Sequence, residues 1–120
     1  MLTLPPTVRV FVSLLPTDMR RSFDGLAALT REIIRQDPLS GHLFAFFNRP
    51  RDRVKILLWD RSGYTLWYKR LEEGVFKLPR SGEGHEPSME LTAAELSLIL
   101  EGLDLANVRR HHRFAMRSSA

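Results

Sequence analysis

The sequence predicts an α/β (α+β-like) single domain, with a mostly antiparallel sheet of four to five strands and two main helices packed against it. Three observations favour this fold. Apolar segments of strand length recur along the chain, one stretch has the apolar spacing of a helix, and a capping motif precedes a second helix. The 120 residues are 43% hydrophobic and include no cysteine, so one core must form without disulfides.

The first strand and the first helix are expected in the first third of the chain. Residues 8–14 (VRVFVSL) are apolar and rich in β-branched side chains, which favours a largely buried strand. Ser22 can cap the following helix and Pro38 stops it, so we expect a helix over 23–36. Its apolar positions recur at helical spacing and are Phe23, Leu26, Ala27, Thr30, Ile33 and Ile34.

Three strands are predicted in the middle of the chain, at 42–47, 53–59 and 64–70. A short edge strand is expected to follow at 75–78, ended by Pro79. An exposed edge strand of this kind could pair with a second copy of the chain, so a homo-oligomer is one expectation.

The turn 60–63 (DRSG) predicts a hairpin and also constrains its register. Pairing Trp59 with Tyr64 places Leu57 opposite Leu66 and Lys55 opposite Tyr68, which groups aromatic and aliphatic side chains. A shift by one residue would set Lys55 opposite Lys69, which like-charge repulsion disfavours.

The C-terminal part begins with a loop and continues into a helix. Residues 80–88 contain two glycines and a proline, which is typical of a loop. Thr92 and Glu95 form a capping box, with Leu91 and Leu96 as its hydrophobic staple, so a helix is expected over 92–102. We therefore place the domain at 1–106 and expect 107–120 to be a disordered basic tail.

Charge is distributed unevenly. Residues 42–80 hold nine Lys and Arg against four acids, residues 81–106 hold six acids and no Lys or Arg, and 107–120 hold four arginines and no acid. This asymmetry favours a nucleic-acid partner. The candidate nucleic-acid-binding residues are Arg49, Arg51, Arg53, Lys55, Lys69 and Arg70.

Each feature of this basic region has a functional and a structural interpretation. The arginines around Pro50 can contact successive phosphates, or can solvate turns and protect sheet edges. The aromatic residues Trp59, Tyr64, Trp67 and Tyr68 can stack on unpaired bases, or can belong to the core.

Signals for catalysis, metals and cofactors are weak, so we expect a protein that is not an enzyme, with no cofactor and no metal. The histidines (His42, His85, His111 and His112) lack a zinc-type spacing, and His42 heads an apolar strand, where a capping or core role is expected. Four acids could form a nuclease site: Asp18, Asp24, Asp52 and Asp60. Asp52 and Asp60 flank one predicted strand, about 20 Å apart at strand rise, so they cannot share an ion.

The sequence shows no targeting signal or membrane-spanning segment. The start MLTLPPTVRVFV lacks a basic n-region, and no apolar stretch is long enough to span a bilayer. A soluble cytoplasmic protein without a membrane partner is the expectation.

Several segments together resemble a known family. They are Thr17–Leu26 (TDMRRSFDGL), Asp37–Phe44 (DPLSGHLF), Asp52–Leu57 (DRVKIL), Leu66–Leu71 (LWYKRL) and Leu100–Asp104 (LEGLD). In this order and spacing they are similar to the TnpB-type accessory protein of the IS66 class of bacterial insertion sequences. The likeness covers about residues 8–105. One departure is Ser22, where the pattern would have glycine after the basic pair.

The resemblance implies a small protein that acts beside the transposase and is needed for efficient transposition. It implies neither the transposase itself nor the RNA-guided nuclease that shares the TnpB name, and it carries over no catalytic residue. The partners it suggests are insertion-element DNA, the transposase and other element-encoded proteins.

Three hypotheses follow. The first is a non-enzymatic accessory protein that contacts element DNA through the basic hairpin. The second is an adaptor that bridges the transposase to other proteins through Asp18–Arg21 and the acidic segment Glu90–Asp104, without binding DNA. The third and least favoured is a metal-dependent nuclease using Asp18 or Asp24.

Overall fold

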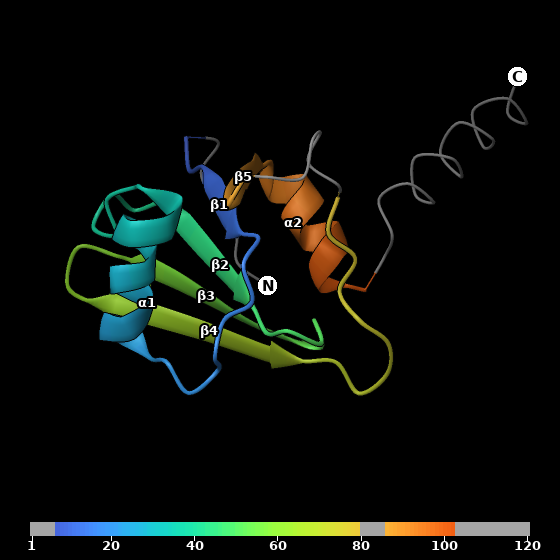
Figure 1. Cartoon of the computed structure of the whole chain (residues 1–120). Coiled ribbons are helices and arrows are strands. Elements are labelled where there is room, and N and C mark those ends of the chain that lie inside the picture. The colour runs from blue at the N-terminus through green and yellow to red at the C-terminus, as the bar shows by residue number, and fades with distance from the viewer. Residues whose placement is uncertain (1–6, 80–85, 103–120) are drawn as a thin grey trace, which may run out of the picture.

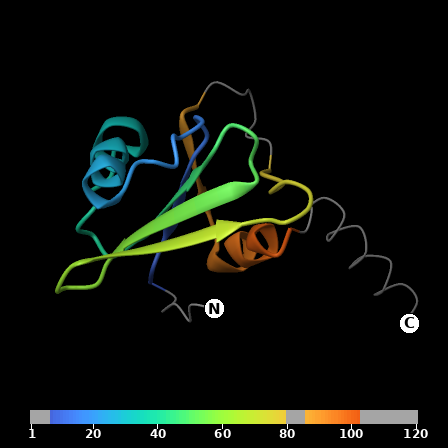
Figure 2. The same ribbon diagram turned by 90° about the horizontal axis from the view of Figure 1, so that it is seen from below.

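The computed structural model describes residues 7–79 and 86–102, which form one five-stranded sheet with helices on both faces (Figures 1 and 2). The strands are β1 (Val10–Ser13), β2 (Leu43–Phe47), β3 (Arg53–Trp59), β4 (Tyr64–Arg70) and β5 (Ser88–Leu91). Their order is β4-β3-β2-β1-β5, and only the β1–β2 pair is parallel. The predicted fold class is confirmed.

The parallel pairing of β1 and β2 requires a crossover, which the first helical segment provides. It consists of α1 (Phe23–Leu29) and a π-helical continuation, η1 (Thr30–Ile34). This segment covers one face of the sheet, and α2 (Ala93–Leu100) covers the other, as Figure 2 shows.

Each face of the sheet has its own apolar cluster. On the α1 face, Leu26 packs with Phe44, Phe46 and Leu57. On the α2 face the cluster joins strand and helix residues: Val10, Val12, Ala45, Phe47, Ile56, Leu96 and Ile99. All five residues of β2 are buried, because the strand is central and covered on both sides.

The first helix begins at Phe23 as predicted but ends two residues before the predicted end. Ser22 is the N-cap residue, but its side chain makes no capping hydrogen bond, and Phe23 is 42% exposed. The helix ends at Ile34 because Arg35 adopts a left-handed conformation (φ 61°), three residues before Pro38. Thr30, fully buried, donates its hydroxyl to the Leu26 carbonyl at 2.9 Å.

The hairpin has the predicted register. Trp59 lies opposite Tyr64, Leu57 opposite Leu66 and Lys55 opposite Tyr68. Asp60 holds the turn by accepting hydrogen bonds from the N–H groups of Ser62 and Gly63.

The predicted edge strand at 75–78 is wrong. These residues form no strand, because Phe76 turns its side chain into the α2-face core (1% exposed) and donates its N–H to the Arg51 carbonyl at 2.7 Å. The edge strand beyond β1 is β5, which begins at Ser88, inside the predicted loop. Residues 80–85 of that loop lie outside the described residues.

The capping box at α2 is confirmed. Thr92 Oγ1 accepts the Glu95 N–H at 3.1 Å, and Glu95 Oε1 accepts the Thr92 N–H at 3.1 Å. The staple residues Leu91 and Leu96 are both buried.

Asp104 and the predicted tail 107–120 lie outside the described residues. No helix of 7–79 or 86–102 has the length and apolarity to cross a bilayer.

Replacing Thr92 with alanine is expected to lower the free energy of unfolding by about 1 kcal/mol, because the Glu95 N–H loses its acceptor. Chemical denaturation followed by circular dichroism measures this change. Glu95→Gln keeps the capping geometry and serves as the control, with a change within about 0.5 kcal/mol. An equal loss in both variants would contradict the role given to Thr92.

Candidate nucleic-acid interface

The turn between β2 and β3 is held by the side chain of Asn48. Its Oδ1 accepts the N–H groups of Asp52 and Arg53, both at 3.1 Å, and its Nδ2 donates to the Asp52 carboxylate at 2.6 Å. The backbone N–H of Asn48 donates to the Arg53 carbonyl at 3.2 Å. These hydrogen bonds fix the backbone conformation of the short turn.

Two of the predicted arginines lie at the tip of this turn. Arg49 and Arg51 are exposed, and Arg51 has a left-handed backbone conformation with φ 60°. The carbonyl of Arg51 accepts the N–H of Phe76, whose side chain is buried in the core, and this bond holds the backbone of the turn in place. The turn therefore presents both guanidinium groups from a fixed backbone.

Arg53 and Arg70 lie directly opposite each other at the end of the β3–β4 ladder. Like charges in this position cost stability. The two side chains diverge: Arg53 donates to the Tyr68 hydroxyl at 3.2 Å, and Arg70 pairs with the exposed Glu72 at 3.1 Å. The register that keeps Lys55 away from Lys69 thus brings two other cations together.

Lys55 lies apart from the other predicted residues because it is only 7% exposed. Its ammonium donates to the backbone carbonyls of Met19 at 2.6 Å and Arg21 at 2.8 Å, and lies 4.9 Å from the centre of the Tyr68 ring. All three contacts are internal. This geometry argues against a phosphate contact by Lys55.

Lys69 also serves the fold. Its ammonium donates to the carbonyl of Leu100, the last residue of α2, at 2.6 Å. A cation is favourable at this position because the carbonyls of a helix C-terminus carry partial negative charge. Lys69 points to the α2 face, whereas Arg53 and Arg70 point to the α1 face, so it does not join them.

The structure adds one arginine that the sequence did not single out for DNA. Because Lys55 binds the Arg21 carbonyl, the loop before α1 lies against the basic end of β3. Arg21 is exposed, and its side chain passes close to Gly25. We call Arg21, Arg49, Arg51, Arg53 and Arg70 the arginine surface.

The neighbouring Arg20 is neutralised within the chain. Its guanidinium pairs with the Asp18 carboxylate at 2.6 Å. These hydrogen bonds, together with one from the Arg20 N–H, lower the pKa of Asp18 from 3.8 to about 2. By contrast, among the described residues Arg21, Arg49, Arg51 and Arg53 have no ion-pair partner within 4.0 Å.

The four aromatic residues considered for base stacking differ in exposure and in position. Trp59, Tyr64 and Trp67 are half-buried, and Trp59 contacts Tyr64 edge to face at 5.1 Å. Tyr68 is 48% exposed and lies between Lys55 and Arg53. Of the four predicted stacking residues, Tyr68 is the one placed within the arginine surface.

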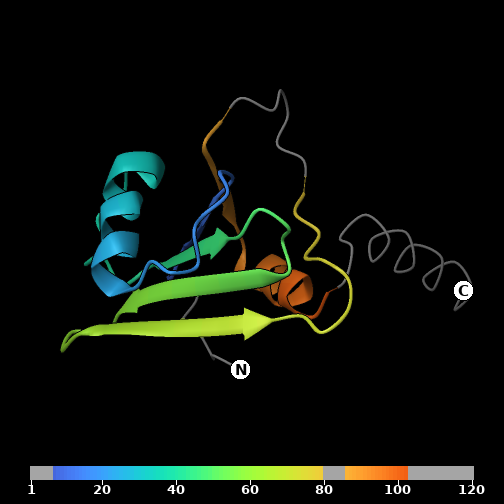
Figure 3. The ribbon, with the colours of Figure 1, turned by 60° about the horizontal axis from the view of Figure 1, so that its bottom comes forward.

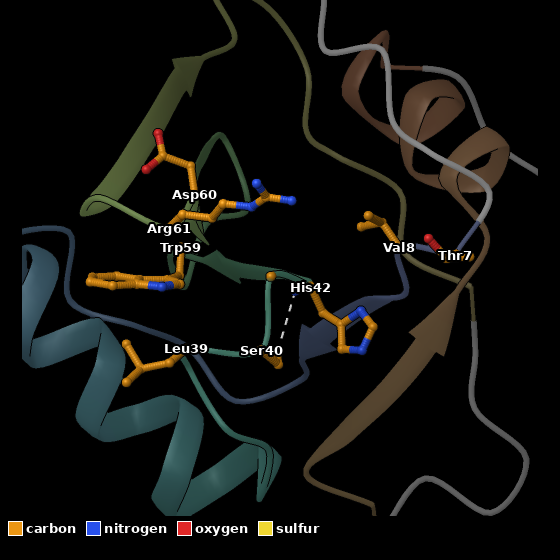
Figure 4. A pocket seen from close by; sticks show the side chains of 9 residues that line it. Thr7, Val8, Leu39, Ser40, His42, Trp59, Asp60 and Arg61 are labelled. Carbon is orange, nitrogen blue, oxygen red and sulfur yellow. Dashed lines mark hydrogen bonds between the residues drawn. The ribbon is translucent and has the colours of Figure 1, made fainter.

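A pocket of about 510 Å³ lies at the opposite end of β3, where Trp59 and Leu39 are on one side and His42 on the other (Figure 4). His42 Nδ1 accepts the Arg9 N–H at 2.9 Å, so the neutral imidazole carries its proton on Nε2. The carboxylate of Asp60 accepts hydrogen bonds within its own turn, which lower its pKa. The pocket shares no residue with the arginine surface. Its remaining lining residues are Thr7, Val8, Ser40, Gly41 and Arg61.

The acids considered for a nuclease site are dispersed. Asp52 and Asp60 lie at opposite ends of β3, and Asp18 is in the loop before α1. Within 7–79 and 86–102, no group of three or more His, Asp and Glu side chains is placed to hold a metal ion. His85, His111 and His112 lie outside this part of the chain.

Comparison with known proteins defines the class. The family model described as IS66 Orf2-like protein matches residues 8–110, so the chain belongs to this family. Membership associates it with transposition of IS66-class insertion sequences and confirms the resemblance seen in the sequence.

Two curated relatives come from Sinorhizobium fredii, and both carry the description of uncharacterized proteins. Protein y4jC is 36% identical over 103 residues, which covers 86% of either chain. Protein y4hO is 38% identical over 104 residues, covering 87% of this chain and 88% of the relative. No solved structure matches the chain.

Lys55→Met is expected to lower the free energy of unfolding by about 2 kcal/mol, because two charge-assisted hydrogen bonds are lost and the carbonyls of Met19 and Arg21 lose their donor. Denaturant titration measures the loss. Lys77→Met, at an exposed position, is the matched control and should stay within about 0.5 kcal/mol of the parent. Similar values for both would mean that the Lys55 contacts add no stability.

The Asp18 carboxylate predicts a pH effect. Its folded-state pKa of about 2 is below the ordinary 3.8, so its contribution to stability is present above about pH 4 and is lost as the pH falls towards 2. Carbon-13 NMR titration of the carboxyl group reads this pKa directly. In Arg20→Gln the pKa should return towards 3.8; an unchanged value would show that Arg20 is not its cause.

Proposed function

We propose that this chain is a non-catalytic accessory protein for IS66-class transposition that holds insertion-element DNA on its arginine surface. The observation that carries the proposal is that arginines lie on three neighbouring segments, which are the loop before α1, the turn 48–52 and the paired ends of β3 and β4. Arginine forms bidentate hydrogen bonds with phosphate and stays charged at any cellular pH.

The arrangement suits the DNA backbone better than a small ligand. The arginines lie on turns and strand ends fixed by the Asn48 and Lys55 contacts, so little order must be gained on binding. Tyr68 adds an exposed ring among them, which could stack on an unpaired base. Contacts of this kind position the protein on DNA, and sequence readout would need further contacts with base edges.

Fluorescence anisotropy with the full chain tests the proposal. Labelled terminal repeat of the element, scrambled duplex and single strand are titrated across a salt series. The proposal predicts binding with a steep salt dependence, because each phosphate contact releases counterions. Preference for the terminal repeat would identify a sequence-recognising subunit. Absence of binding at physiological salt would refute the DNA-binding function.

Charge reversal at Arg51 and Arg53 is expected to weaken DNA binding at least tenfold and to flatten its salt dependence. A matched control reverses Arg31 and Arg61, two exposed arginines remote from the surface. The control gives the same change in net charge and also replaces one left-handed arginine, since Arg61 has φ 84° and Arg51 has φ 60°. Equal losses of DNA affinity in the two variants would show only an effect of net charge and would contradict DNA binding by the arginine surface.

An adaptor role is the alternative, and one observation favours it. Phe23 is 42% exposed directly after the Asp18–Ser22 loop, and so offers an apolar contact to a protein partner. Against it, the charges proposed for that contact are partly satisfied within the chain, by the Asp18–Arg20 pair and by the Arg9–Glu90 pair at 2.6 Å. Co-purification with the transposase from nuclease-treated lysate, lost in Phe23→Ser, would support the adaptor.

A further inference from the structure

Strand β4 forms one edge of the sheet, and within the described residues nothing pairs with its outer side (Figure 3). It is seven residues long, contains no proline and pairs with β3 without a bulge. Natural edge strands usually carry a device against pairing, such as a proline, a bulge or a charged side chain. Here the strand's one lysine, Lys69, is turned to the Leu100 carbonyl, and its one arginine, Arg70, is paired with Glu72 at the strand end, so neither places an unpaired cation along the middle of the edge.

The ladder shows which backbone groups are unpaired. Asp60 donates its N–H to the Gly63 carbonyl at 3.1 Å, and Leu71 donates to the Asp52 carbonyl at 2.8 Å. Hydrogen-bonded pairs alternate along an antiparallel ladder, so residues 65, 67 and 69 bond to β3. The N–H and C=O groups of Tyr64, Leu66, Tyr68 and Arg70 therefore face outwards.

We propose that β4 pairs antiparallel with β4 of a second copy of this chain, with the two-fold axis at Trp67. This register pairs all seven residues of both strands. Tyr64 then lies opposite Arg70, Leu66 opposite Tyr68, and Thr65 opposite Lys69. No two cations face each other.

Other self-pairings are less favourable. An in-register parallel pairing would stack Lys69 on Lys69 and Arg70 on Arg70, which like-charge repulsion opposes. An antiparallel shift by two residues loses the outermost pairs and their backbone hydrogen bonds. The strand is thus most complementary to its own copy about Trp67, whose half-buried ring would meet its symmetry mate on the α2 face.

The dimer would form one sheet of ten strands. The two-fold axis of an antiparallel strand pair is perpendicular to the sheet, so both copies would present their α1 faces, and with them Arg53 and Arg70, on the same side. The two Arg70 positions would be about 20 Å apart along the strands, which is six residue rises. Two arginine surfaces related by a two-fold axis would then face one partner.

The absence of cysteine allows a direct test on the full chain. In Trp67→Cys the two sulfur atoms would meet at the axis, where opposite Cα atoms of a non-hydrogen-bonded pair are about 4.5 Å apart, within disulfide range. Mild oxidation should give a covalent dimer on non-reducing gels. In Thr65→Cys the two thiols would be four residue rises apart, about 13 Å, and should not crosslink.

Sedimentation of the unmodified protein gives an independent readout, with a dimer expected in the micromolar range. Tyr68→Pro removes an outward N–H without breaking the β3 ladder and should sediment as a folded monomer, with circular dichroism reporting its fold. A parent protein that is monomeric up to submillimolar concentration would overturn the proposal. So would a dimer that persists in Tyr68→Pro, or crosslinking of Thr65→Cys as fast as Trp67→Cys.

Discussion

The burial of β2 on both faces is the constraint on which the rest of the structure depends. Each of its five side chains must be covered, so the chain has to supply one helical layer on each side of the sheet. The parallel pairing with β1 places the first layer, since the crossover must pass over a face of the sheet. The capping box begins the second layer directly after β5.

Lys55 links this architecture to the basic end of the sheet. Its ammonium replaces water with two backbone carbonyls and an aromatic ring, so the loop before α1 is tied to the basic end of β3. A lysine in a predicted strand gives no sign of this, because its partners are 34 and 36 residues away. The same contact brings Arg21 to the arginine surface. The Lys55 ammonium is thus removed from solvent, while the side chain of Arg21 stays exposed.

Local interactions made part of the fold predictable. The hairpin register followed from a four-residue turn and from neighbouring side chains, and the capping box from a spacing of three residues. Strand β5 was missed because its four residues include no β-branched side chain and pair with β1, far away in the sequence. The same holds for the candidate site: the placement of Arg49 and Arg51 in an exposed turn could be predicted from sequence, whereas the internal roles of Lys55 and Lys69 arise from long-range contacts.

The left-handed backbone of Arg51 has a consequence for anyone who engineers this protein. Glycine adopts such a conformation without steric cost, whereas a side chain there carries strain of about 1 kcal/mol or more. A laboratory search for heat-resistant variants would therefore favour replacing Arg51 with glycine. It would remove a guanidinium group from the tip of the turn in the same step. Selection for stability alone would therefore change the charge of this turn.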